Sequence, residues 1–500
     1  MASRGTGERR ALVQKISRLI PLMHTWTDWA AKLTSKALVI LLVIWYAFVA
    51  AYTWTINSDF ISRDQWHFLL MVDHFMSGTL DWHEFWLSHS EHVKPAYKLL
   101  FLLNAKYLNL NIMVETMAGI LLLGAASLLM LNQMIKNSNT TPQQTMPRFA
   151  LLVVGMVLMS FNQWANYAYS LLALGGFGGM LVQLVFFTEF SHLLDRRLSI
   201  IQISILVVAL LMGVFGFSGA RSPAVVGGAT IAAFTSFMLS PEARSRILRY
   251  ATPLLILGFV SIGIYFLLLH SSSSEHSDLV RDLKEVLADP LGAITYISDT
   301  MSESMLDMTE ADKSVRAPLL SAGLSVFGFL ILGWSLWRYF KAEYWRKTWV
   351  PLMLISYSSL FVLEVIVGRY GKETFSLHSS SVPRYVFDSH LWIVGAAWIM
   401  GLDWVKSPNR VNKHAAIDLV PAVVLMFIFT LEITNLVLAY QMWSFQRNAV
   451  TKVMRELREV ASGNESVYSL PTWVCPSKPL CKQGFVILKK YQLNVAKGVY

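Results

Sequence analysis

The side chains best suited to chemistry gather in residues 57–111, a polar stretch between two apolar runs. This stretch interleaves carboxylates with aromatic rings, and Asp64 and Glu91 are the candidates for a general base. A carboxylate can take a proton when burial and neighbouring groups tune its pKa. Candidate substrate-binding residues around them are Asp59, Trp66, His92 and Lys94. The alternative is a solvated loop whose charges only keep it out of lipid.

The same stretch contains several histidines: His67, His74, His83, His89 and His92. They form no HExxH pair and no comparable helical spacing, so we predict no zinc site. A divalent cation held by aspartate and glutamate stays an open alternative, because hard cations prefer oxygen ligands.

Two arginines, Arg369 and Arg384, flank a polar segment that follows the apolar run 350–367. A guanidinium fork matches phosphate geometry and stays charged at biological pH, so both arginines, with Tyr385, are candidate phosphate-binding residues. Arg221, in a turn between two other apolar runs, is the candidate third cation. Snorkelling of these side chains toward lipid headgroups is the alternative.

Further polar candidates lie at or within apolar runs. Asn162 and Trp164 stand at the end of one run, where an amide beside an aromatic ring can bind sugar hydroxyls, or where both can simply belong to an interfacial aromatic belt. Glu364 lies about one turn before Arg369. An ionisable residue at membrane depth is a functional candidate, or else the partner of an arginine.

The elements that must position these residues are membrane-spanning helices. Hydrophobic residues make up 54% of the 500 positions and charged residues 15%, whereas a typical soluble protein has about 25% charged residues. A spanning helix needs roughly 20 mostly apolar residues, and the sequence predicts about eleven such helices in an all-α integral membrane fold. The predicted spans are 37–56, 112–134, 149–166, 171–190, 199–217, 224–240, 251–270, 317–337, 350–367, 386–404 and 416–440.

The distribution of charge predicts the topology. The net charge of +10 comes from short Lys and Arg clusters between apolar runs. That pattern is typical of the positive-inside rule and argues against a nucleic-acid-binding surface. It places the amphipathic segment 1–36 in the cytoplasm, before a transmembrane domain over 37–440. The long segments 57–111 and 271–316 and the tail 441–500 are then outside.

The outside segments have predictable local features. The first long loop contains a run at 95–108 that is too short and too rich in lysine to span, and we expect it to form a juxtamembrane or re-entrant helix. The second long loop has helical spacing, and we expect it to lie along the membrane surface. The tail holds the only cysteines of the chain, Cys475 and Cys481. An outside tail lies in an oxidising compartment, so we predict a disulfide between them, with two free thiols as the alternative.

The layout of these motifs resembles a known family. Residues 63–66 (RDQW) and 91–94 (EHVK) lie in the first outside loop, and Gly368-Arg369 and Pro383-Arg384-Tyr385 lie in a late one. This resembles bacterial polytopic glycosyltransferases of the GT-C superfamily, including phage-type serotype-converting O-antigen glucosyltransferases. Their first loop often carries Asp-Asp-Trp and Glu-His-Arg, and their late loop Gly-Arg and Ser-Arg-Tyr. This sequence departs from that family pattern. One aspartate of the acidic pair is missing, Val93 replaces an arginine, and Pro383 replaces a serine.

The resemblance implies a GT-C-like fold in the bacterial inner membrane and a hexosyltransferase activity. A sugar would move from a polyprenyl-phosphate donor to a cell-envelope glycan, such as the O-antigen of lipopolysaccharide, on the periplasmic face. Asp64, or else Glu91, would deprotonate the acceptor hydroxyl, while Arg369, Arg384 and Arg221 stabilise the leaving phosphate. The resemblance implies no nucleotide at this face. The alternatives are a lipid-linked glycan flippase or transporter, and an O-antigen polymerase or ligase.

Overall fold

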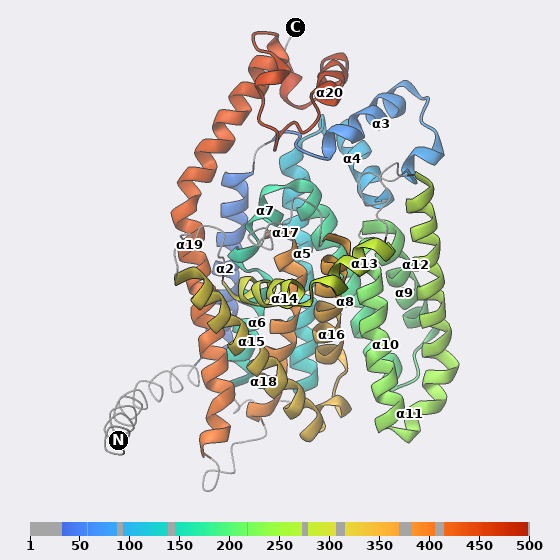
Figure 1. Ribbon diagram of the computed structural model, residues 1–500, viewed down its shortest axis with the longest axis vertical. Coiled ribbons are helices and arrows are strands. Elements are labelled where there is room, and N and C mark those ends of the chain that lie inside the picture. The colour runs from blue at the N-terminus through green and yellow to red at the C-terminus, as the bar shows by residue number, and fades with distance from the viewer. Residues whose placement is uncertain are drawn as a thin grey trace.

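The computed structural model describes residues 33–57, 59–87, 94–138, 146–217, 219–272, 279–306, 316–369, 383–405 and 415–498. Within these ranges every regular element is a helix (Figure 1). Ten helices in the described ranges are long and apolar enough to cross a membrane, and each overlaps one predicted span. The chain is therefore an all-α, multi-pass membrane protein, as predicted.

The helices have the following bounds: α2 (Ser35–Ile56), α3 (Gln65–Ser77), α4 (Pro95–Leu108), α5 (Ile112–Ser138), α6 (Met146–Leu158), α7 (Trp164–Ala168), α8 (Ser170–Asp195), α9 (Ile200–Leu211), α10 (Ser222–Leu239), α11 (Pro241–Arg246), α12 (Thr252–Ser272), α13 (Leu279–Ala288), α14 (Pro290–Met305), α15 (Arg316–Lys341), α16 (Val350–Arg369), α17 (Pro383–Ser389), α18 (Leu391–Val405), α19 (Ala415–Ser462) and α20 (Lys478–Tyr491). The short connecting turns used below are η1 (Trp82–Phe85), η2 (Phe161–Gln163), η3 (Met212–Phe217) and η4 (Gly219–Arg221).

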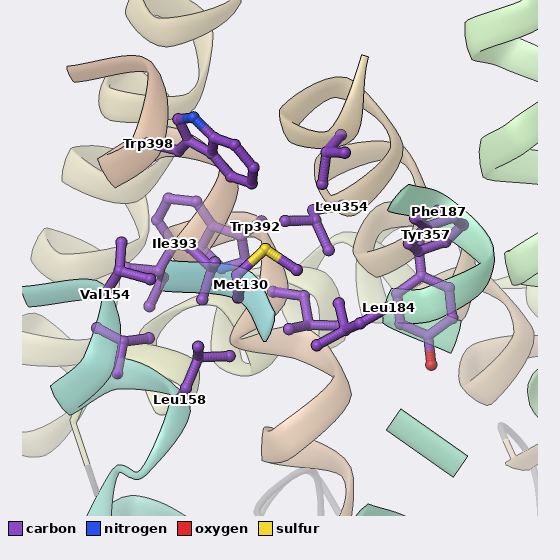
Figure 2. Packing of buried hydrophobic residues seen from close by; sticks show 14 of the residues in the cluster. Met130, Val154, Leu158, Leu184, Phe187, Leu354, Tyr357, Trp392, Ile393 and Trp398 are labelled. Carbon is purple, nitrogen blue, oxygen red and sulfur yellow. The ribbon is translucent and has the colours of Figure 1, made fainter. Parts of the chain in front are cut away.

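The predicted span 386–404 is an interrupted helix. The chain breaks at His390, between α17 and α18. With 15 residues, α18 is about 22 Å long, shorter than the roughly 30 Å hydrocarbon core. It nevertheless lies at the centre of the bundle, where Trp392, Ile393 and Trp398 pack among residues of α5, α6, α8 and α16 (Figure 2).

Two segments far apart in the sequence form one compact unit at one end of the bundle, which we call the cap: the described parts of residues 59–111, together with residues 450–498. Figure 1 shows α3, α4 and α20 side by side at this end. Phe68, Phe101 and Leu488 are among the buried residues of their shared apolar core. The predicted disulfide between Cys475 and Cys481 is present in the cap, and both residues are fully buried.

The cap changes the predicted domain boundary. Helix α19 is 48 residues long and runs without a break to Ser462, whereas we predicted a span over 416–440 followed by a separate tail. The continuous helix carries the chain from the bundle into the cap (Figure 1). The tail is therefore tied to the first loop rather than standing alone.

The second long loop contains α13 and α14, which cross the bundle at a steep angle to the neighbouring spans (Figure 1). Pro290 starts α14, and the Asp289 side chain accepts a hydrogen bond from the N–H of Gly292 at 2.9 Å, which caps that helix. α13 contacts α16, and α14 contacts α15 and α17. Of the predicted cytoplasmic segment 1–36, residues 1–32 lie outside the described residues.

Candidate functional site

The Arg63–Asp64 dipeptide lies in a turn that buried neighbours fix from several sides. Gln65 is buried, and its side-chain amide donates to the Tyr97 hydroxyl at 2.9 Å and to Ser170 Oγ at 2.7 Å. Its Oε1 accepts the N–H of Ser62 at 3.2 Å. Asp64, at the start of α3, is half-buried and makes no side-chain cap hydrogen bond to that helix.

Arg63 is one of the few residues with a positive φ, at 50°. This left-handed conformation costs a non-glycine residue roughly 1 kcal/mol. Its exposed guanidinium lies over the Tyr169 ring, 4.7 Å from the centroid, a contact worth about 0.5–1 kcal/mol at an exposed site. Tyr169 stands between α7 and α8, so this contact joins the first loop to the bundle.

The first loop also reaches the bundle through α4. The Trp86 and Phe215 rings meet at 6.4 Å between centroids. A Cβ added to Gly216 would lie 3.6 Å from that of Ala96, which follows Lys94 by two residues. Lys94 itself is half-buried at the start of α4. η3 is followed in the chain by η4, which ends at Arg221.

Arg221 is held by a carboxylate of α17. Its guanidinium lies 2.9 Å from Asp388 Oδ2, and Asp388 is completely buried. The Tyr357 hydroxyl donates to the other oxygen, Oδ1, at 2.6 Å. In the structure Arg221 is thus the counter-ion of a buried aspartate, a role that we did not predict for it.

Helix α17 is the element at which the predicted motifs meet. It contacts α7, η2, α14 and α16. Arg384 lies one turn before Asp388 on the same helix, and Arg369 is the last residue of α16. Three predicted phosphate-binding side chains lie outside the described part of the chain: Arg369, Arg384 and Tyr385. The predicted site residues Glu91 and His92 lie outside it as well.

Two predicted substrate-binding residues have structural partners instead. Asp59 accepts the backbone N–H of Ile112 at 2.6 Å and the Asn494 side-chain amide at 3.3 Å. Burial raises the pKa of Asp59, and these hydrogen bonds oppose the rise. Trp66 is buried, and its indole N–H donates to the carbonyl of Val474 at 2.8 Å. Asp59 therefore joins the first loop to the start of α5 and to the C-terminal segment, and Trp66 joins it to the C-terminal segment.

Asn162 is buried at the interruption between α6 and α7. Its amide donates to the carbonyl of Glu303 and lies 3.5 Å from His390 Nε2. His390 stands at the interruption between α17 and α18, so the two helix breaks meet there. Trp164 is half-buried and packs against the main apolar core.

Several buried ionisable groups were not among our candidates. Glu115 accepts hydrogen bonds from Asn104 at 2.7 Å, Ser170 at 3.0 Å and Tyr97 at 3.1 Å. Glu432 of α19 is 1% exposed. An ionisable residue within an apolar run is the signal that identified Glu364, and the same signal marks Glu432.

Glu364 has a different partner from the one considered. Its carboxylate accepts the backbone N–H of Ala224, near the start of α10. It also lies close enough to Asp388 for their charges to interact. Glu364, Asp388 and Arg221 therefore form one cluster of ionisable groups where α10, α16 and α17 meet, and Asp388 is its completely buried member.

No group of three potential metal ligands occurs within the residues that the structure describes. One predicted histidine, His74, contacts the Glu84 carboxylate at 2.9 Å on the cap surface. A divalent cation held by residues outside the described ranges, such as Glu91, stays a prediction.

Comparison with known proteins adds no family to these observations. Searches of protein-family models and of curated proteins found no match for the chain.

Proposed function

We propose that the chain is a membrane glycosyltransferase that moves a sugar from a polyprenyl-phosphate donor to a cell-envelope glycan. The supporting observation is the approach of the acidic first loop to α17, the helix that carries Arg384. This approach follows two routes, from Arg63 through Tyr169 and α7, and from α4 through η3 and Arg221. The Asp64 carboxylate and the guanidinium groups of Arg369 and Arg384 would together suit a reaction in which a phosphate leaves.

The proposed step is a single displacement. Asp64, or else Glu91, takes the proton of the acceptor hydroxyl. The hydroxyl oxygen then forms a bond to the anomeric carbon, and the bond from that carbon to the donor phosphate oxygen breaks. The phosphate leaves with the electron pair, and Arg369 and Arg384 stabilise its added negative charge. Tyr385 follows Arg384 on α17 and completes the proposed donor site, and Lys94, at the start of α4, is a proposed substrate-binding residue.

The buried Cys475–Cys481 disulfide supports placing the cap outside the cytoplasm, because disulfides persist in oxidising compartments. We propose that the cap faces the periplasm of a bacterial inner membrane, with the N-terminus in the cytoplasm. The acceptor would then be a periplasmic glycan such as the O-antigen of lipopolysaccharide.

A direct test uses the purified protein in proteoliposomes with a panel of polyprenyl-phosphate hexoses and a lipopolysaccharide acceptor. Release of polyprenyl phosphate is measured for the wild type, Asp64→Asn, Glu91→Gln and the double variant. We expect one single variant to lose at least a hundredfold in rate, as removal of a general base does. Glu456→Gln is the matched control, since Glu456 is half-buried and makes a long 3.9 Å pair with the exposed Lys452. Full activity of the double variant would refute the base assignment.

One observation favours a second function, transport of a lipid-linked glycan. The interruptions α6/α7 and α17/α18 meet at Asn162 and His390, and meeting helix breaks are typical of transporter binding sites. The same proteoliposomes decide between the two functions. Movement of a fluorescent lipid-linked glycan between leaflets, without release of polyprenyl phosphate from any donor, would favour transport and exclude the transferase.

A further inference from the structure

A single backbone carbonyl of the C-terminal segment holds the turn that contains Asp64. The carbonyl of Val474 accepts the backbone N–H of Arg63 at 3.0 Å and the indole N–H of Trp66 at 2.8 Å. These two donors stand on either side of Asp64. The orientation of the Asp64 backbone therefore depends on the position of Val474.

The disulfide fixes Val474 in turn. The N–H groups of Val474 and Cys475 both donate to the carbonyl of Pro471, at 3.0 and 2.9 Å, which forms a tight turn. Cys475 is bonded to Cys481, which lies in the first part of α20. The disulfide thus connects the turn that presents the Val474 carbonyl to a helix of the cap.

Helix α20 holds Trp66 from its other side. Gly484 approaches the Trp66 ring so closely that an added Cβ would lie 2.6 Å from Cε3. Phe485 packs against the same ring, with 5.1 Å between centroids. Trp66 is 1% exposed. The indole is therefore fixed by its N–H on one side and by α20 on the other.

We propose that the segment 471–491, which the Cys475–Cys481 disulfide cross-links, is a positioning element for the Arg63–Asp64 turn, and that Trp66 is the residue through which it acts. The catalytic meaning of this positioning rests on the proposed function, whereas the clamp itself does not. An intact Cys475–Cys481 bond is then a condition for the correct orientation of Asp64.

The clamp can be tested by hydrogen exchange at single amides in the full-length protein. Trp66→Phe keeps an aromatic ring at the site and removes the N–H donor together with part of the buried indole volume, while Cys475→Ser combined with Cys481→Ser removes the disulfide. In both variants we expect exchange of the Arg63 amide to become roughly tenfold faster, since its hydrogen bond opens more often. The Leu110 amide, bonded to Asn104 O at 3.1 Å within the cap, should keep its wild-type rate.

A matched substitution controls for the loss of a tryptophan. Trp473 neighbours Val474 in the same segment but is 36% exposed, so Trp473→Phe should leave the Arg63 amide unchanged. Unchanged Arg63 exchange in Trp66→Phe would overturn the proposal, whatever the folding of the cysteine variant. Equal acceleration at Leu110 would also overturn it, because it would indicate general loosening of the cap.

Sugar transfer provides the second readout. If the wild type is active, Trp66→Phe should lower kcat about tenfold with little change in the donor KM, because positioning of a base acts on the chemical step. Unchanged kcat despite faster Arg63 exchange would overturn the positioning role. If the wild type transfers no sugar, the proposed function fails, and the exchange data still decide whether the clamp exists.

Discussion

Replacement of Arg221 by Gln tests whether this arginine serves mainly as the counter-ion of Asp388. Asp388 has no exposed surface in the structure, and Arg221 is 14% exposed. Removing one partner of a buried ion pair costs about 3–5 kcal/mol, because the other charge is left uncompensated. The Tyr357 hydroxyl still donates to Asp388, and Arg221 retains some contact with water. We therefore expect the lower end of that range, about 3 kcal/mol.

A double-mutant cycle separates this loss from other effects of the substitution. Asp388→Asn alone leaves Arg221 without its carboxylate, whereas the pair of substitutions Arg221→Gln and Asp388→Asn removes both members of the ion pair. We expect the double variant to lose about 2 kcal/mol less unfolding free energy than the two single variants lose together. That difference is within the range measured for residues in contact. The free energy of unfolding is measured in mixed micelles with increasing denaturing detergent.

Activity provides the complementary measurement for the same variants. A cation that mainly binds the donor phosphate would lower sugar transfer on Arg221→Gln and leave stability unchanged. Additive losses of unfolding free energy across the cycle would refute the counter-ion role and restore Arg221 as a candidate phosphate ligand.

Two further predictions concern the cap and its attachment. Glu115→Ala should destabilise the protein by about 2–4 kcal/mol, because it leaves the Asn104 and Tyr97 donors buried without their acceptor. Glu115→Gln should lose less unfolding free energy. Equal losses for the two variants in denaturant unfolding would contradict this prediction. The Asp73 carboxylate accepts a hydrogen bond from Lys490 at 2.7 Å, which holds the pKa of Asp73 below its ordinary value of 3.8. This contact therefore stabilises the protein above pH 3.8 and is lost as the pH falls through the lowered pKa. The protection of α20 amides from hydrogen exchange, taken relative to the intrinsic rate at each pH, should fall in that acid range, and Asp73→Asn should show the reduced protection already at neutral pH.

The spans could be predicted from sequence because length and apolarity are local properties of a segment. The cap could not, because its contacts join distant parts of the chain. The bond from Trp66 to Val474 connects residues 408 positions apart. Composition marked Trp66 and Asp59 as substrate-binding candidates, but it contains no information on which side chains turn inward. The disulfide was predictable because the chain has only two cysteines.

The helix interruptions could not be predicted from the apolarity of the sequence either. Residues 386–404 are apolar enough to predict one span, yet the structure divides the segment at His390. The polar residues at this break find partners on other elements, as Asp388 does with Arg221 and Tyr357. A buried polar residue costs free energy unless it is paired, so its position depends on partners that a local pattern cannot identify.

The backbone at Arg63 bears on the choice between a functional loop and a solvated one. A loop whose charges only keep it out of lipid has no need for a left-handed arginine, which costs roughly 1 kcal/mol. Here the conformation is maintained by the Val474 carbonyl, the ring of Tyr169 and the buried side chain of Gln65. Backbone strain that is over-determined by its surroundings clusters at functional sites. This turn is a rigid support for the task that we propose for Asp64, and the exchange rate of the Arg63 amide is the most direct measure of whether the surroundings enforce its conformation.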